Sequence, residues 1–232
     1  MREVVMDTET TGLDPDTGDR IVEIGGVELY NHMPTGRVYH QYINPERDMP
    51  EGAFAVHGLS AEFLSDKPVF KAIAEAFLEF VGDAKLVIHN ASFDMKFLNA
   101  ELKWIGNQPL PWSQAIDTLE IARRKFPGAQ NSLDALCRRF GVDNSAREKH
   151  GALLDSEILA EVYLELIGGR QPDFALNVVG GTDVERGNAA ATNAALPERP
   201  AALPSRLTEA ERQAHEAFVS TLVKDALWLQ AK

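Results

Sequence analysis

The chain has 232 residues, 44% of them hydrophobic and 25% charged, and 35 acidic against 23 basic residues give it a net charge of −12 at pH 7. The hydrophobic and charged fractions are those of a globular protein. The net negative charge argues against a protein that binds nucleic acid by charge alone. The single cysteine, Cys137, excludes a disulfide framework and a metal site built from cysteines. No apolar run approaches the ~20 residues of a membrane span and no signal peptide is visible, so we expect a cytoplasmic protein.

Strand and helix patterns alternate along the first part of the chain. Short apolar runs bounded by polar or turn-forming residues predict strands at residues 4–6, 21–30, 38–43 and 86–88, with a turn over 31–36. Apolar side chains at helical spacing predict helices at residues 70–81, 94–105, 131–140 and 153–167, the last one ending at Gly168-Gly169. This order is typical of an α/β fold with a mixed central sheet that is covered by helices on both faces.

The composition changes late in the chain. Residues 1–168 carry 16 basic and 27 acidic side chains, a net charge of −11, whereas residues 169–232 carry 7 and 8. Residues 180–206 are rich in Ala, Gly and Pro and contain no aromatic residue, which is typical of a flexible linker. We therefore expect three parts: a domain at residues 1–169, a linker at 170–206 and a short helical tail at 207–232.

Two carboxylates end the first predicted strand, in the segment Asp7-Thr8-Glu9. Residues i and i+2 of a strand point to the same side, so Asp7 and Glu9 are expected side by side where the chain leaves the sheet. Hard cations such as Mg²⁺ or Mn²⁺ bind oxygen ligands and would relieve the repulsion between two carboxylates. The alternative for this pair alone is that Asp7 caps a helix and Glu9 is solvated.

Three further polar residues come from other segments. Asp94 follows the strand at 86–88, where sites collect in α/β sheets, although it also fits an acid at a helix N-terminus. Asp155 lies among apolar residues of the last predicted helix and so needs a partner or a metal. His150 converges with Asp155 only if it lies in the loop before that helix, with Gly151 permitting the bend; a surface histidine is the alternative.

Together, the four acids and the histidine suit phosphoryl chemistry with two metal ions. Two cations can clamp the attacking and leaving oxygens of an in-line displacement. A histidine, with an ordinary pKa near ~6.5, suits a general base for water at neutral pH. The constellation therefore predicts two divalent metal ions, Mg²⁺ or Mn²⁺, as cofactors.

These motifs resemble those of the DEDDh 3′→5′ exonuclease family. The resemblance is carried by residues 7–12, by the turn at 90–94 and by the pair His150 and Asp155, in that order and spacing. Further segments are similar to the family members that proofread DNA synthesis as subunits of a replicative polymerase: residues 56–59, 86–90, 131–137 and 150–163. The resemblance covers residues 3–169 strongly and implies a ribonuclease H-like exonuclease fold.

The resemblance also implies roles for the five polar residues. Asp7, Glu9 and Asp155 would ligate the tighter metal and meet the substrate there. Asp7 would bridge to the second metal, with Asp94 acting directly or through water. His150 would take a proton from the water that attacks the terminal phosphodiester, and a 5′-mononucleotide would leave the 3′ end. Charge neutralisation and positioning would lower the barrier.

Contacts to the terminal nucleotide are implied as well. His57 would lie at that nucleotide, and Gly52 would offer only its backbone there. Leu13 would either wedge under the terminal base or merely close its turn. Asn90 would hold the backbone of the substrate or bridge its own turn. Asp117 fits both an acid behind the site and a helix N-cap.

Basic clusters are few in this acidic chain. Residues 123–125, 138–139 and 147–149 contain them, and they could contact the phosphates of a nucleic acid. We expect Arg138 and Arg139 to lie on an exposed, solvated face of a helix, because runs of charged residues usually do.

The tail is similar to the partner-binding segments of the proofreading subunits. A short glutamine-led apolar motif would dock on the sliding clamp, although a chance apolar hexapeptide is the alternative. The terminal helix would bind the alpha subunit of the polymerase, or else pack on its own domain. The residues expected to carry these contacts are Gln171, Phe174 and Leu176 for the clamp, and Phe218, Leu222 and Trp228 for the polymerase. A small theta-like accessory subunit is a further expected partner.

The resulting hypothesis is a proofreading 3′→5′ exonuclease that acts on a single-stranded or frayed 3′ end of DNA. One alternative is a free-standing RNA-trimming exonuclease of the same family, which would not need the linker and the partner helix. Another alternative is a non-catalytic scaffold between polymerase and clamp. The complete set of acids together with His150 argues against a scaffold.

Overall fold

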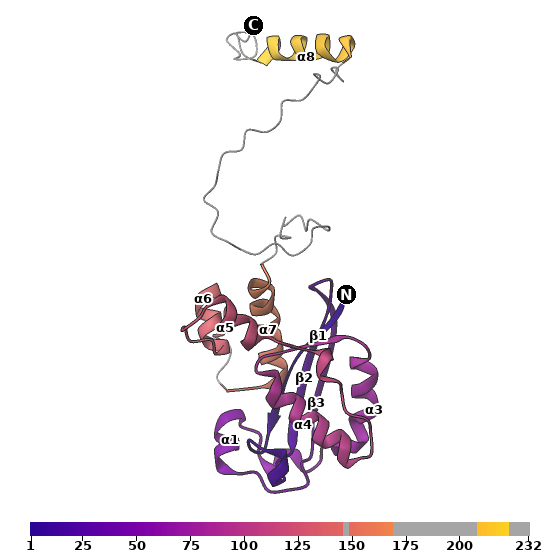
Figure 1. The fold of residues 1–232 in the computed structure, drawn as a ribbon, viewed down its shortest axis with the longest axis vertical. Helices are drawn as coiled ribbons and strands as arrows, with labels where there is room; N and C mark the ends of the chain where they lie inside the picture. Colours follow the sequence, from indigo (N-terminus) through magenta and orange to yellow (C-terminus); the bar gives the residue numbers. More distant parts are fainter. Residues whose placement is uncertain (146–148, 169–207, 223–232) are drawn as a thin grey trace, which may run out of the picture. The chain divides into compact units, whose positions relative to one another are not determined.

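A computed structural model describes residues 1–145, 149–168 and 208–222 of the chain (Figure 1). The chain divides into two units, Met1–Leu176 and Asn177–Lys232, and each is described by itself. Within the described ranges, no helix is long and apolar enough to cross a lipid bilayer.

The first unit is built on a five-stranded mixed sheet. Its strands are β1 Arg2–Thr10, β2 Ile21–Tyr30, β3 Met33–Tyr42, β4 Lys85–Ile88 and β5 Ala115–Asp117, in the order β3-β2-β1-β4-β5. β1 pairs antiparallel with β2 and parallel with β4, while β2–β3 is antiparallel and β4–β5 is parallel. The mixed sheet of the α/β prediction is confirmed, and β5 is a strand that the sequence analysis did not predict.

The turn between β2 and β3 is tighter than predicted. Asn31 and His32 both have positive φ angles, 49° and 64°, and β3 begins at the next residue. Two consecutive residues with positive φ form the type I′ turn that matches the twist of a hairpin. The predicted turn over 31–36 is therefore wrong beyond its first two residues.

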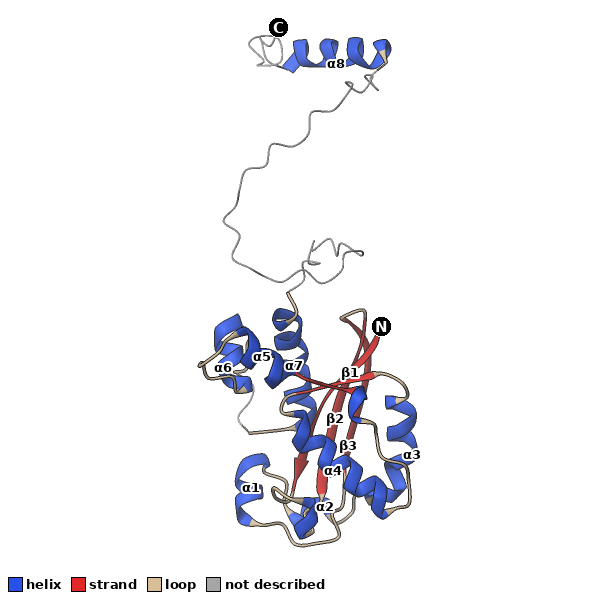
Figure 2. Cartoon of the chain, in the orientation of Figure 1, coloured by secondary structure: helices blue, strands red, loops and turns tan. Residues whose placement is uncertain are grey.

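Helices cover both faces of the sheet, and β1 is buried between them (Figure 2). Val4 and Met6 pack with α3 Phe70–Val81 and α4 Ala91–Trp104. Val5, the residue between them, packs with α7 Ala152–Leu166 on the opposite face. This alternation is the two-residue period of a strand that is buried on both sides.

Three helices begin where the sequence pattern did not place them. α4 starts three residues before the predicted Asp94, because Asn90 adopts a left-handed conformation (φ 66°, ψ 52°) and turns the chain from β4 directly into the helix. Asp94 therefore lies in the first turn of a helix and not in the preceding loop. α1 Glu51–His57 and α2 Ala61–Leu64 were not predicted.

The remaining helices lie after β5 and in the second unit. α5 Thr118–Lys125 and α6 Leu133–Phe140 follow β5, and two short 3₁₀ segments, Pro15–Thr17 and Trp112–Gln114, precede α1 and β5. In the second unit, α8 Glu209–Leu222 lies within the predicted tail helix. Thr208 and Glu211 form a capping box at its start, with Thr208 N donating to Glu211 Oε2 at 2.8 Å.

β2 and α7 approach so closely that only glycine fits between them. A Cβ on Gly25 would lie 2.2 Å from the backbone carbon of Ala152 and from the backbone nitrogen of Leu153. The buried Ser156 hydroxyl lies 2.6 Å from the Ala152 carbonyl oxygen and 3.0 Å from the Gly25 carbonyl oxygen, so it bridges α7 and β2 at the same contact. The first turn of α7, which carries Asp155, is thereby held against the sheet.

Candidate active site

A cavity of about 810 Å³ opens where β1 and β4 end. These strands are parallel, so their carboxyl ends meet at one edge of the sheet, where ligand sites of α/β proteins lie. A β-bulge between Glu9 and Thr10 ends the regular pairing of β1 at this place. The five residues that the sequence predicts to be catalytic all line the cavity: Asp7, Glu9, Asp94, His150 and Asp155.

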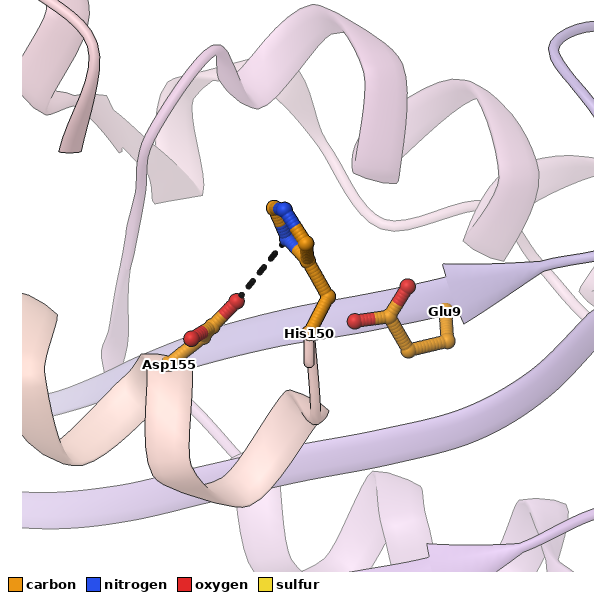
Figure 3. Close-up of side chains that lie close together, drawn as sticks. All are labelled: Glu9, His150 and Asp155. Atoms are coloured by element: carbon orange, nitrogen blue, oxygen red, sulfur yellow. Dashed lines mark ion pairs between the residues drawn. The ribbon is translucent and has the colours of Figure 1, made fainter. Parts of the chain in front are cut away.

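Three of these residues form a tight cluster (Figure 3). Within the described part of the chain, Glu9, His150 and Asp155 each offer one ligand atom, and these atoms lie within 4.8 Å of one another. His150 Nδ1 lies 3.3 Å from Asp155 Oδ2, with the imidazole half exposed and the carboxylate buried. Figure 3 shows the Glu9 carboxylate turned toward the other two side chains.

His150 reaches this cluster from the loop that precedes α7, as expected. Gly151 is the N-cap of the helix in an extended conformation (φ −153°, ψ 123°), so the chain does not place His150 on the helix itself. The backbone nitrogen of His150 donates to the carbonyl of Val56 at 3.3 Å, which ties the loop to α1. The prediction that a bend brings His150 to Asp155 is confirmed.

Asp94 is held from the opposite face of β1. The Thr8 hydroxyl donates to Asp94 Oδ1 at 2.7 Å, and the carboxyl group is 2% exposed. Burial raises the pKa of Asp94 to about 7, against the lowering effect of the hydrogen bond from Thr8, and the charge of Asp117 raises it further. Without a cation nearby, this carboxyl group is therefore partly protonated at neutral pH.

The turn after β4 is braced by Asp117. Its Oδ1 accepts hydrogen bonds from the backbone nitrogens of Asn90, at 3.1 Å, and Leu119, at 2.9 Å, so Asp117 is the N-cap of α5. The N-cap alternative for this residue is confirmed, and the same carboxylate also supports the turn of the site. Asn90 lines the cavity.

Three residues that were expected at the terminal nucleotide lie outside the lining of this cavity. His57 is 6% exposed at the end of α1, where its Nδ1 accepts from Leu59 N at 3.0 Å, and burial lowers its pKa. Leu13 is 84% exposed. Gly52 lies in the first turn of α1, with no atom within 4 Å of an added Cβ. Their contact with a substrate stays a prediction.

The far wall of the cavity comes from residues outside the five predicted catalytic ones, and of these only Arg123 belongs to a cluster that was expected to contact phosphates. His89, Arg123 and Asn131 line it together with the loop before α6. His89 Nδ1 lies 3.0 Å from the Thr118 hydroxyl, and burial lowers the pKa of this imidazole. Only the place of His89 directly after the predicted strand at 86–88 could have indicated it.

The basic clusters differ in what they contact. Arg139 stacks over the ring of Phe126, 4.3 Å from its centroid, and donates to Asn131 Oδ1 at 3.3 Å. Arg138 and Arg139 are both exposed, as expected, and Arg139 is in addition held by the aromatic face, which is a good partner for guanidinium. Arg147 lies outside the described residues.

The tail residues can be placed only in part. Phe218 lies on α8 and is 60% exposed, and Leu222 is the last residue of that helix. The other residues that were expected to contact partners lie outside the described residues: Gln171, Phe174, Leu176 and Trp228.

The donor set of the cavity fits hard divalent cations. Glu9, Asp94 and Asp155 are at most 7% exposed, and burying several carboxylates at one place is costly unless positive charge offsets them. Carboxylate oxygens are the ligands that Mg²⁺ and Mn²⁺ prefer. The chemistry of the residues therefore fits the predicted metal ions.

Known proteins resemble this chain over most of its length. A family model described as "Exonuclease" matches residues 4–163. A protein of Rickettsia felis named "DNA polymerase III subunit epsilon" is 52% identical, with 97% of this chain and 99% of that protein covered. A protein of the same name from Escherichia coli is 41% identical, with 98% and 97% covered.

Solved structures share the fold of the first unit. Exonuclease X in complex with 5′ overhanging duplex DNA is 26% identical with a TM-score of 0.54, over 72% of this chain and 90% of that one. The nuclease domain of 3′hExo, a DEDDh family member bound to rAMP, is 20% identical with a TM-score of 0.63, over 72% and 91%. The second likeness shows the fold alone, and both agree with the predicted exonuclease fold.

Proposed function

This chain belongs to the exonuclease family and is a 3′→5′ exonuclease, and from that premise we propose that it proofreads DNA synthesis as a subunit of a replicative polymerase. The observation that carries the proposal is the convergence of Asp7, Glu9, Asp94, His150 and Asp155 on one cavity. Its relatives at 41–52% identity over nearly their whole length, which carry the name of a polymerase subunit, support the cellular role.

Two divalent metal ions, Mg²⁺ or Mn²⁺, would be held by the carboxylates. Asp7, Glu9 and Asp155 would hold one of them, and Asp7 would share the other with Asp94, directly or through water. When bound, such ions supply positive charge for the attacking and leaving oxygens of an in-line displacement at phosphorus. Thr8 keeps Asp94 turned toward the cavity through its 2.7 Å hydrogen bond.

His150 is the general base of the proposed reaction. Its Nδ1 faces Asp155 Oδ2, so that an Nδ1–H donating to this carboxylate leaves Nε2 as the acceptor for a proton. Water attacks the phosphorus of the last phosphodiester and gives its proton to Nε2. The bond from phosphorus to the 3′ oxygen breaks, that oxygen takes up a proton, and a 5′-mononucleotide is released.

We propose partners for the tail on the same premise. The exposed Phe218 of α8 supports a contact of the tail with the alpha subunit of DNA polymerase III. The clamp motif at Gln171, Phe174 and Leu176 and a theta-like accessory subunit remain proposals from the resemblance. A replication subunit of this kind would work in the cytoplasm, where bacterial chromosomal DNA is copied.

A degradation assay with labelled substrates tests the proposed activity. The 5′-labelled substrates are DNA with a paired 3′ end, DNA with a mispaired 3′ end and RNA, each with Mg²⁺, Mn²⁺ or EDTA. We expect stepwise shortening from the 3′ end with either metal, faster at the mispaired end because unpairing costs least there. Activity in EDTA would contradict the metal proposal, and faster loss of RNA than of DNA would favour the RNA-trimming alternative.

The role of the tail is tested by truncation. A chain that ends at Gly169 keeps all five cavity residues, so its exonuclease activity should equal that of the full chain. It should not co-purify with the polymerase alpha subunit, whereas the full chain should. If the shortened chain still binds that subunit, the proposed role of the tail is wrong.

A further inference from the structure

We propose that Arg123 binds the phosphate that precedes the scissile phosphodiester, so that the cavity holds a second phosphate subsite at its far wall. The inference rests on the proposed function, because it assumes that a DNA strand enters with its last phosphodiester at the carboxylates. It narrows the general expectation that the basic cluster at residues 123–125 contacts phosphates to one residue and one phosphate.

Among the described residues that line the cavity, Arg123 is the lone lysine or arginine. Aside from histidines, the other charged residues in this described lining are acidic: Asp7, Glu9, Asp94, Asp134 and Asp155. Divalent ions would offset the acids near the scissile phosphodiester but would not neutralise the next phosphate along the strand. A guanidinium supplies that charge and can bind two phosphate oxygens at once.

Three consecutive basic residues end α5, and they differ in their surroundings. Arg124 Nη1 lies 3.8 Å from Glu120 Oε1, one helical turn away. Lys125 Nζ donates to the carbonyl of Leu166 at 3.0 Å, which joins α5 to the end of α7. Arg123 makes no salt bridge with any described residue and is directed at the cavity. Successive residues of a helix point about 100° apart, which explains why these three neighbours face different surroundings.

The wall beside Arg123 is held in place by a network of hydrogen bonds. The buried Asn131 donates from Nδ2 to the carbonyl of Ala129 at 3.0 Å and accepts from Arg139 at 3.3 Å. Arg139 is fixed in turn by its stacking on Phe126. Because the wall is already fixed in this way, its side chains need not be ordered when a substrate binds, which lowers the entropic cost of binding.

This subsite also bears on the acidity of the chain. An enzyme with a net charge of −12 repels a nucleic acid as a whole. One arginine next to the site can still attract the end of a single strand, provided that the strand passes it. The contact should therefore depend on the length of the substrate and on the salt concentration.

The test compares two single-stranded substrates in the full-length protein. The thymidine dinucleoside monophosphate has one phosphodiester and no preceding phosphate, whereas a thymidine hexanucleotide has both. The measured quantity is the ratio of kcat/KM for the hexanucleotide to kcat/KM for the dinucleoside monophosphate, at several salt concentrations and saturating Mg²⁺. The variants are Arg123→Ala, Arg123→Lys and, as the matched control on the same helix, Arg124→Ala.

For Arg123→Ala we expect the ratio to fall about two- to fivefold, mainly through KM, as befits one exposed ion contact. The slope of log kcat/KM for the hexanucleotide against log salt should become shallower by about 0.7, the value for one phosphate contact on a single strand. Arg123→Lys should lose less than Arg123→Ala, and Arg124→Ala should keep the wild-type ratio and slope.

An unchanged ratio in Arg123→Ala, or an equal fall in Arg124→Ala, would overturn the subsite. A wild-type protein that cleaves neither substrate would instead contradict the proposed function, so the two failures are distinguishable. Circular dichroism and melting temperature of each variant show whether α5 is intact.

Discussion

The Thr8 hydroxyl donates a 2.7 Å hydrogen bond to Asp94 Oδ1, which joins β1 to the first turn of α4 beneath the cavity. Thr8 stands between Asp7 and Glu9 and, by the alternation of a strand, points to the other face of the sheet. One short strand segment therefore presents two carboxylates on one side and positions a third acid on the other. The acidic motif of β1 and the acid of α4 are physically coupled at this residue.

Removing that hydroxyl should impair the site without removing any acid. Thr8→Val keeps the shape but leaves the buried Asp94 without this donor, so we expect a loss of about 1–3 kcal/mol in the free energy of unfolding. We also expect kcat/KM to fall about tenfold, because Asp94 is no longer held toward the cavity. Thr8→Ser retains the donor and serves as the control. Equal activity of the Val and Ser variants would refute this role.

Asp94 makes the stability of the metal-free protein depend on pH. Burial raises the pKa of Asp94 from its ordinary value of 3.8 to about 7 in the folded chain, so between these pH values the folded state holds a proton that the unfolded state has lost. Stability then falls as pH rises from 3.8 to about 7. In EDTA, Asp94→Asn should have the same stability as the wild type near pH 3.8. Above about pH 7 it should be more stable than the wild type.

Chemical denaturation of both proteins in EDTA across this pH range measures that difference. A difference in stability that does not change with pH would contradict the cause assigned to Asp94. Addition of Mn²⁺ at neutral pH should raise the melting temperature of the wild type more than that of Asp94→Asn, since a cation that binds only the folded state stabilises it.

Gly25 tests whether the packing of α7 controls the site. Gly25→Ala would place a Cβ 2.2 Å from the backbone of Ala152 and Leu153, so α7 must move away from β2 together with Asp155. We expect a lower melting temperature and a loss of exonuclease activity. The neighbouring Gly26→Ala meets only side-chain atoms at 3.3 Å and beyond and is the matched control. If the two alanine variants behave alike, the close approach is not what positions the site.

The site could be predicted largely from the sequence, because its signals are local. Asp7 and Glu9 directly follow an apolar run, and Asp155 stands among apolar helix residues, so each polar side chain is conspicuous where it occurs. The elements at residues 21–30 and 70–81 were predicted with their observed bounds, since their apolar periods run over many residues.

Other features could not be predicted because they depend on tertiary contacts. β5 has three residues and is a strand only because β4 pairs with it. α1 has no side-chain cap and contains Gly52, so its local propensity is weak. The left-handed Asn90, which sets the start of α4, and the wall that carries Arg123 leave no periodic pattern in the sequence.

His150 could act as a general base or as a metal ligand, and its effect on metal affinity distinguishes the two roles. As a general base it takes a proton but holds no metal, although its ring lies in the same cluster as Glu9 and Asp155. His150→Gln should lower kcat about 10²- to 10⁴-fold, while the Kd for Mn²⁺ stays unchanged. Titration calorimetry measures that Kd. A Kd weakened tenfold or more would mean that His150 is a metal ligand instead.

The most direct measurement of the central claim follows the release of nucleotides from 5′-labelled single-stranded DNA by the wild type and by Asp7→Ala. Asp7 lies at the end of β1, where its loss leaves the apolar core untouched, so the variant should keep the melting temperature of the metal-free wild type. We expect the wild type to shorten the DNA from its 3′ end with Mg²⁺ or Mn²⁺, and Asp7→Ala to be slower by roughly a thousandfold. Metal-dependent release by Asp7→Ala at the wild-type rate would contradict the assignment of this cavity as the active site.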